Sequence, residues 1–172
     1  GAKIFYTQDA SNMDEDVDLV VYTVAIPSTN SELTEARRRG IAVRSYPEIL
    51  GIISKDKYTI AVSGTHGKTT TTAMIAQVLI DAGMDPTVIV GSFLLEAKSN
   101  FIAGRSKYFV VEACEYKRSF LNIHPNILVI TNIDNDHLDY YKDIADIESA
   151  FNELAKRLSK DDFVVCNPKD NL

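Results

Sequence analysis

The 172-residue sequence has few cysteines and no long apolar segment, and each of these gaps excludes a class of protein. Its two cysteines, Cys114 and Cys166, have neither the spacing of a metal site nor the density of a disulfide scaffold. No stretch reaches the ~18–20 consecutive apolar residues of a membrane span, and the first residues lack the pattern of a signal peptide. We therefore expect a cytoplasmic protein without membrane insertion.

Clustered positive charge is also scarce, since the formal net charge is -6 and the longest basic run is Arg37-Arg38-Arg39. A nucleic-acid surface requires a clustered positive footprint, so we expect no nucleic-acid partner. Gly40 follows the three arginines, and a glycine after cations is typical of a helix C-terminus. The sequence therefore favours small molecules as partners.

Seven short apolar runs recur along the chain, at residues 19–24, 41–43, 58–62, 88–90, 108–111, 127–130 and 163–165. Continuous apolar runs of this length are typical of strands that are buried on both faces. Stretches that fit helices lie between them, at residues 30–39, 68–82 and 144–158. Because strands and helices alternate, the sequence predicts an α/β fold with a mainly parallel sheet flanked by helices.

A polar stretch at residues 54–57 precedes the third of these strands and is the best candidate for a domain boundary. We expect one domain over residues 1–56 and another over residues 57–172.

The strand expected at residues 58–62 leads into Ser-Gly-Thr-His-Gly-Lys-Thr-Thr at residues 63–70, and a helical stretch follows. This order is the setting of a phosphate-binding loop, whose glycines let successive N–H groups point at phosphate oxygens. Lys68 would neutralise the outer phosphates and Thr69 would offer its hydroxyl to Mg²⁺. We predict that ATP and Mg²⁺ are bound here, by Gly64, Thr65, His66, Gly67, Lys68, Thr69 and Thr70.

The loop is a short form, since residue 62 is Val where the common pattern has glycine. The alternative interpretation is a glycine-rich turn before an ordinary helix. The strand, the lysine and the threonine together favour the phosphate loop.

Acidic and imidazole side chains follow two later strands. Glu112 and Glu115 come where the run at 108–111 ends, and His137 lies in the segment after the run at 127–130. Ligands gather at the carboxyl ends of strands in open parallel sheets, so we expect three strand ends to converge. Glu112 could hold Mg²⁺, and His137 could bind a second cation with Asp136 or Asp139 fixing its tautomer. Taken singly, each of these side chains is more often a solvated loop residue than a metal ligand.

Three motifs in order identify a resemblance: residues 63–70, residues 112–121 and residues 131–137. Together they closely resemble the Mur ligases of peptidoglycan synthesis, and residues 20–37 resemble the end of that family's UDP-binding domain. The resemblance implies a partial Rossmann-like domain for a UDP-sugar over residues 1–56, followed by the first part of a P-loop ATPase domain over residues 57–172. It also implies that a glycine-rich opening segment and an amino-acid-binding C-terminal domain are missing, so that the chain is a fragment.

The resemblance further implies an ATP-dependent amide ligase that joins L-alanine to UDP-N-acetylmuramate through an acyl phosphate. Lys68 would stabilise the transferring phosphoryl group, and Thr69 and Glu112 would hold the first Mg²⁺. His137 would help to hold a second ion. The catalytic residues implied are therefore Lys68, Glu112 and His137.

Asn132 and Glu115 would shape the substrate carboxylate site by the same resemblance. Many relatives have Asp where this chain has Cys114, and we interpret the cysteine as packed behind the site. Two alternatives remain open. One is a sister ligase, such as a murein-peptide ligase or more remotely a folylpolyglutamate synthetase. The other is a nucleotide-binding module without ligase activity.

Overall fold

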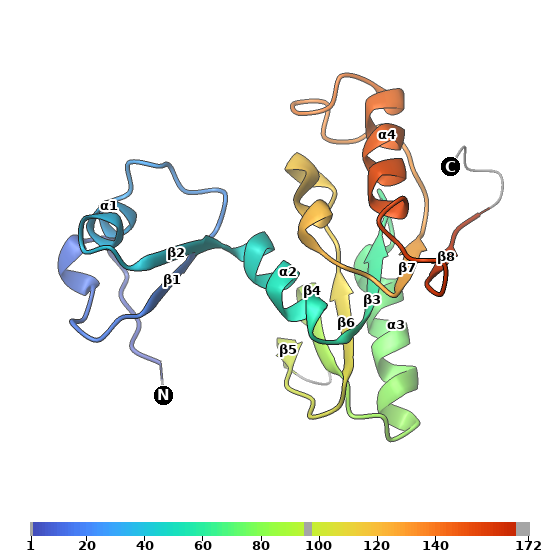
Figure 1. The fold of residues 1–172 in the computed structure, drawn as a ribbon, viewed down its shortest axis with the longest axis horizontal. Coiled ribbons are helices and arrows are strands. Elements are labelled where there is room, and N and C mark those ends of the chain that lie inside the picture. The colour runs from blue at the N-terminus through green and yellow to red at the C-terminus, as the bar shows by residue number, and fades with distance from the viewer. Residues whose placement is uncertain (1, 95–97, 168–172) are drawn as a thin grey trace. The chain divides into compact units, whose positions relative to one another are not determined.

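The computed structural model describes residues 2–94 and 98–167. Figure 1 shows its helices and strands. The chain divides into two compact units, Gly1–Ile49 and Leu50–Leu172. None of the helices in the described ranges is long and apolar enough to cross a membrane.

The first unit is built on a two-stranded parallel sheet. Its elements are η1 (Ala10–Asn12), β1 (Leu19–Tyr22), α1 (Ser31–Arg38) and β2 (Ala42–Ser45). Helix α1 begins where the Asn30 side chain accepts a hydrogen bond from the Leu33 N–H, which satisfies one free donor of the first turn. The chain leaves α1 through Gly40 at a φ of 72°, so the predicted helix end with its glycine is confirmed.

Helix α2 (Tyr46–Lys55) follows β2 and was not expected from the sequence. Its start is a capping box, because the Ser45 N–H donates to Glu48 Oε2 at 2.6 Å and the Glu48 N–H faces Ser45 Oγ at 3.4 Å. Leu50 and Ile53, from the second half of α2, pack into the core of the second unit. The boundary between residues 56 and 57 stays a prediction.

The second unit is a six-stranded sheet with the strand order β5-β4-β6-β3-β7-β8. Its elements after α2 are β3 (Tyr58–Ser63), α3 (Lys68–Asp81), β4 (Thr87–Leu94), β5 (Ser99–Ile102), β6 (Tyr108–Glu112), η2 (Tyr116–Asn122), β7 (Ile127–Ile130), α4 (Ile144–Ala155) and β8 (Phe163–Val165). All neighbouring strands are parallel except β4 and β5, which run antiparallel. The predicted α/β fold with a mainly parallel sheet is confirmed.

Helices cover both faces of this sheet because alternate strand residues are apolar on each side. On one face, Ala61 and Val111 join a core that contains Phe120 of η2 and Phe151 of α4. On the other face, Val110 and its neighbours pack against α3. Such double burial explains why the strands read as continuous apolar runs.

All seven predicted strands and all three predicted helices are present, with ends that differ by a few residues. Helix α2 and strand β5 were not predicted from the sequence. Strand β5 has only four residues, Ser-Asn-Phe-Ile, which is too short and too polar for its periodicity to be distinctive.

Candidate functional site

The candidate site lies at the carboxyl end of β3, the strand between β6 and β7 in the sheet order. Val62 is in register with Glu112 of β6, and Ser63 with Ile130 of β7. Three segments therefore leave the sheet at one level: the loop at residues 64–67, the acidic segment after β6 and the polar segment after β7. The predicted convergence of three strand ends is confirmed.

The loop between β3 and α3 has the backbone of an anion-binding turn. Gly64 and Gly67 have φ values of 129° and 80°, which residues with a side chain rarely adopt. A Cβ at Gly64 would also collide with Thr131 Oγ1. Helix α3 starts at Gly67 without a side-chain cap, so its first N–H groups remain available for an oxyanion. The loop thus fits a polyphosphate.

The segment after β7 braces this loop through hydrogen bonds. Thr65 N–H donates to the Asn132 carbonyl at 2.9 Å, and His66 N–H donates to Asn132 Oδ1 at 3.0 Å. Asn132 Nδ2 and Thr131 Oγ1 both donate to the His66 carbonyl, at 3.0 and 2.6 Å. The side chain of Asn132 is therefore occupied by the loop backbone, while the exposed His66 side chain is held at the loop's outer edge.

Lys68 is folded back onto its own loop. Its Nζ donates to the carbonyls of Gly64 and Thr65, at 2.6 and 3.1 Å, and to Glu115 Oε1 at 2.9 Å. Both partners of the ion pair have little solvent access, with side-chain exposures of 14% for Lys68 and 3% for Glu115. Since burial strengthens electrostatic attraction and raises the cost of an unpaired charge, each side chain depends on the other.

Glu115 is the most deeply buried acid of the site. His137 Nε2 lies 3.6 Å from the same Oε1 that accepts from Lys68. The other oxygen, Oε2, is buried and has no hydrogen-bond partner. Glu115, Asp136 and His137 also each offer a ligand atom within 4.8 Å of the others. An orphaned carboxylate oxygen beside an imidazole and a second carboxylate is a donor set that suits a cation.

Glu112 occupies the position expected of a metal-binding acid. Its Oε2 accepts from Thr69 Oγ1 at 2.8 Å and from the Gly91 N–H of β4 at 2.8 Å. A Cβ at Gly91 would lie 2.8 Å from Glu112 Oε1, so a residue with a side chain there would require the Glu112 carboxylate to move. The carboxylate and the hydroxyl predicted to share an ion are therefore adjacent and are held by backbone.

His137 sits in a strained turn beside Tyr116. Its φ of 52° is in the left-handed region, where histidine is found more often than most residues. The His137 and Tyr116 rings lie 4.8 Å apart, and Tyr116 donates its hydroxyl to Asp139 at 2.9 Å. This hydrogen bond raises the pKa of Tyr116 above its usual range. Asp139 is therefore occupied by Tyr116, whereas Asp136 Oδ2 lies 4.0 Å from His137 Nε2.

Three features of the site escaped the sequence analysis. Gly91 carried no signal, because a glycine in a short strand has many explanations, and Thr131 was noted only as part of a motif. The interpretation of Cys114 as packed behind the site was wrong, because Cys114 is exposed. It follows Ala113, which is fully buried, and successive residues of an extended segment point in opposite directions.

Comparisons with known proteins agree with this geometry. Residues 62–172 match the family description "Mur ligase middle domain", and residues 1–58 match "Mur ligase family, catalytic domain". The chain is 49% identical over 171 residues to the UDP-N-acetylmuramate–L-alanine ligase of Clostridium novyi, and 48% identical to that of Caldicellulosiruptor saccharolyticus. Each alignment covers 99% of this chain.

Two solved structures extend the likeness to the fold. The UDP-N-acetylmuramate-alanine ligase MurC of Thermotoga maritima matches with a TM-score of 0.85 and 34% identity, over 96% of this chain and 38% of that one. The UDP-N-acetylmuramate:L-alanyl-gamma-D-glutamyl-meso-diaminopimelate ligase of Neisseria meningitides matches with a TM-score of 0.82 and 25% identity, over 97% of this chain and 57% of that one.

The chain spans about 37% of the length of the curated relatives that it matches. The middle-domain match alone covers well over half of its residues, and that stretch contains the phosphate loop, Glu112 and His137. The chain therefore belongs to the Mur ligase family.

Proposed function

We propose that the second unit binds ATP with Mg²⁺ at the carboxyl end of β3. The triphosphate would lie across the N-terminus of α3, where free N–H groups and the helix dipole favour negative charge. Lys68 would leave the loop carbonyls and contact the outer phosphates. Thr69 and Glu112 offer two oxygen ligands that are already adjacent, which suits Mg²⁺.

A second cation would be held by His137 with Glu115 and Asp136. Lys68 neutralises Glu115 in the structure, so moving Lys68 toward ATP would leave a buried carboxylate without its counter-charge. A cation beside His137 would restore that balance. Glu115 therefore suits a role in positioning Lys68 and the second ion, while its predicted contact with the substrate carboxylate stays a prediction, as does that of Asn132.

The protein that contains this chain would join L-alanine to UDP-N-acetylmuramate. A carboxylate oxygen of the sugar attacks the γ-phosphorus of ATP, ADP leaves, and an acyl phosphate forms. The amine of L-alanine then attacks the acyl carbon, loses a proton, and expels inorganic phosphate. Bound Mg²⁺ supplies charge neutralisation for the phosphates. The residues of this chain align the phosphoryl group and stabilise its charge, chiefly through Lys68 and the N–H groups of α3.

The 49% identity over 99% of the chain carries this proposal, together with the three motifs at one sheet edge. A ligase that attaches a whole peptide is the second candidate, since one such structure has a TM-score of 0.82. Its 25% identity is lower than the 34% of the alanine-adding enzyme, which favours L-alanine as the acceptor.

We assign residues 1–56 to the end of a UDP-sugar-binding domain and residues 57–172 to the first part of the ATP-binding domain. A ligase that consumes ATP and a nucleotide sugar would act in the cytoplasm, where both substrates are made. The assignment of the two domains rests on the two family matches, whose limits at residues 58 and 62 lie close to the proposed boundary.

The test is an assay of ADP release by a protein that contains this chain and has the full length of its curated relatives. We expect release that requires both UDP-N-acetylmuramate and L-alanine. Release that responds to a peptide but not to L-alanine would favour the second candidate. No ADP release with either acceptor, from a protein that binds ATP, would point to a nucleotide-binding role alone.

A further inference from the structure

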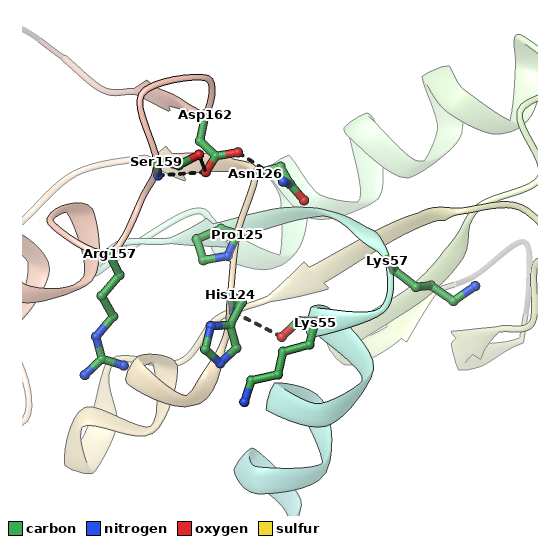
Figure 2. Close-up of a pocket in the computed structure, with 9 residues that line it drawn as sticks. Lys55, Lys57, His124, Pro125, Asn126, Arg157, Ser159 and Asp162 are labelled. Atoms are coloured by element: carbon green, nitrogen blue, oxygen red, sulfur yellow. Dashed lines mark hydrogen bonds between the residues drawn. The ribbon is translucent and has the colours of Figure 1, made fainter.

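A second concave site lies at the amino ends of the strands, whereas the phosphate loop lies at their carboxyl ends. It is a hollow of about 240 Å³, lined by Ser54, Lys55, Lys57, His124, Pro125, Asn126, Arg157, Ser159 and Asp162 (Figure 2). These residues precede β3, β7 and β8, whereas the loop at residues 63–70 follows β3. At ~3.3 Å per strand residue the two sites are roughly 17 Å apart, so the hollow is not part of the proposed ATP site.

Positive charge collects in this hollow although the chain as a whole is acidic. Lys55, Lys57 and Arg157 oppose only Asp162 in the lining, which gives a formal charge of +2 with histidine neutral, in a chain of net charge -6. Asp162 already accepts from Ser159 N–H and Oγ, at 2.8 and 2.6 Å. It also accepts from Asn126 at 3.0 Å. Its charge is thus satisfied locally and does not pair with the cations.

Two cationic side chains and a histidine come together there from separate segments. Lys55 ends α2, His124 lies before β7, and Arg157 follows α4. Figure 2 shows these three side chains extending to the same side of the hollow, while Lys57 points away from them. Lys57 is already bonded to the Ser106 carbonyl at 2.8 Å. Among the described residues, neither the Lys55 ammonium nor the His124 ring has a hydrogen-bond or ion-pair partner.

The cations are close enough to disfavour one another. Partial desolvation, followed by the charges of Lys55 and Arg157, lowers the pKa of His124. The helix C-termini explain a lysine and an arginine at these positions individually. They do not explain why both converge with a histidine on one hollow, where the Lys55 ammonium has no compensating anion among the described residues. Arg157 does pair with Glu153, at 2.8 Å, but Glu153 does not line the hollow.

Hydrogen bonds connect the segments that form part of the wall of the hollow. The His124 N–H donates to Ser54 Oγ at 3.0 Å, and Ser54 itself donates to the Gly51 carbonyl at 2.8 Å. Asn126 Oδ1 accepts from the Thr59 N–H at 2.9 Å, which ties the start of β7 to β3. These hydrogen bonds order the backbone at His124 and Asn126, which lowers the entropy that binding costs.

We propose that this hollow is a binding site for a phosphate-bearing small molecule, held by Lys55, His124 and Arg157. Ammonium, imidazole and guanidinium groups are the side-chain donors that recognise a phosphate oxyanion. The volume exceeds the ~30 Å³ share of one water several times, which leaves room for a phosphate group and a small organic portion.

NMR of the 172-residue chain with inorganic phosphate as the probe tests this. The three histidines give few ring signals, and His124→Gln identifies the one that belongs to His124. We expect phosphate to shift this signal saturably and to raise the pKa of His124. Sodium chloride at equal ionic strength is the first control, because salt screening alone relieves part of the repulsion. A shift that chloride reproduces in full would overturn the proposal.

Matched variants locate the ligand. Lys55→Ala and Arg157→Ala should each weaken phosphate binding at His124 by about threefold or more, as expected for exposed charged contacts. Lys156→Ala, which changes the same charge one residue away but does not line the hollow, should leave it unchanged. Equal losses in the Lys156 and Arg157 variants would contradict the site.

Two further arms separate other sources of the signal. Lys68→Ala weakens the phosphate loop, and the response of His124 should persist in that variant. Its disappearance would assign the response to the loop and overturn the proposal. Acetate at the same ionic strength should shift His124 less than phosphate does. An equal response would contradict a preference for phosphate.

Discussion

Lys68 is the residue on which the proposed chemistry depends most. It lies between the loop carbonyls and Glu115, within reach of the N-terminus of α3 where the phosphates would lie. Lys68→Ala should lower the rate of ADP release more than about a thousandfold, on the order of 4 kcal/mol of transition-state stabilisation. The measurement is steady-state ADP release by the longer protein, with Lys160→Ala, an exposed lysine outside the site, as the control.

The same change leaves Glu115 buried without its partner, so loss of activity could reflect loss of stability. Lys68→Arg separates the two effects, because it keeps the charge but not the shape of the ammonium. We expect this variant to melt near the wild-type temperature and to remain inactive. Near-normal turnover in either Lys68 variant would remove the phosphate-loop assignment.

His137 should determine how much metal the protein needs. Removing its imidazole from the group it forms with Glu115 and Asp136 deletes one ligand of the proposed second ion. We expect His137→Ala to raise the Mg²⁺ or Mn²⁺ concentration for half-maximal activity by roughly 10- to 100-fold. A titration of activity against metal measures this, with Lys160→Ala, an exposed residue outside both sites, as the control. An unchanged titration would return His137 to a surface role.

At this scale the sequence predicted residue types better than contacts. Gly64, Gly67, Lys68 and Thr69 follow from the spacing of the loop, since each backbone or side-chain role is local. The clamp between Asn132 and the His66 backbone joins residues 66 positions apart. No local pattern encodes such a pairing, which arises only because β3 and β7 are neighbours in the sheet.

Strand β4 contributes to the site through its backbone. The Gly91 N–H donates to Glu112, and a methyl group there would meet the Glu112 carboxylate. Gly91→Ala should therefore displace Glu112 from Thr69 and weaken the first metal about tenfold. Calorimetric binding of Mn²⁺ with ATP to the chain measures this, with Ser92→Ala as the neighbouring control. Equal affinity in both variants would show that Glu112 does not need this close approach.

Among the elements, α2 could have been predicted, because the sequence contains the signals of its start. Ser45 and Glu48 form a capping box, and Pro47 lies in the first turn, where its missing N–H costs nothing. Apolar residues then recur at helical spacing up to residue 53. Strand β5 is different, because it gains its structure only by pairing with β4.

On the scale of the whole molecule, the parallel sheet explains why residues far apart in sequence meet. Polar segments that follow β3, β6 and β7 converge because parallel strands end at one edge, which was predictable once the strands were recognised. The hollow at the amino ends of the strands was not predictable, because Lys55, His124 and Arg157 come from a helix end, a turn and a second helix end. Charge at such positions has no period in the sequence.

The central claim is that this chain supplies the ATP-binding part of an alanine-adding ligase. The most direct measurement is ADP release by a protein that contains this chain and has the full length of its curated relatives. We predict release that requires UDP-N-acetylmuramate, L-alanine, Mg²⁺ and an intact Lys68. A folded protein that binds ATP but releases no ADP when both substrates are present would contradict the claim.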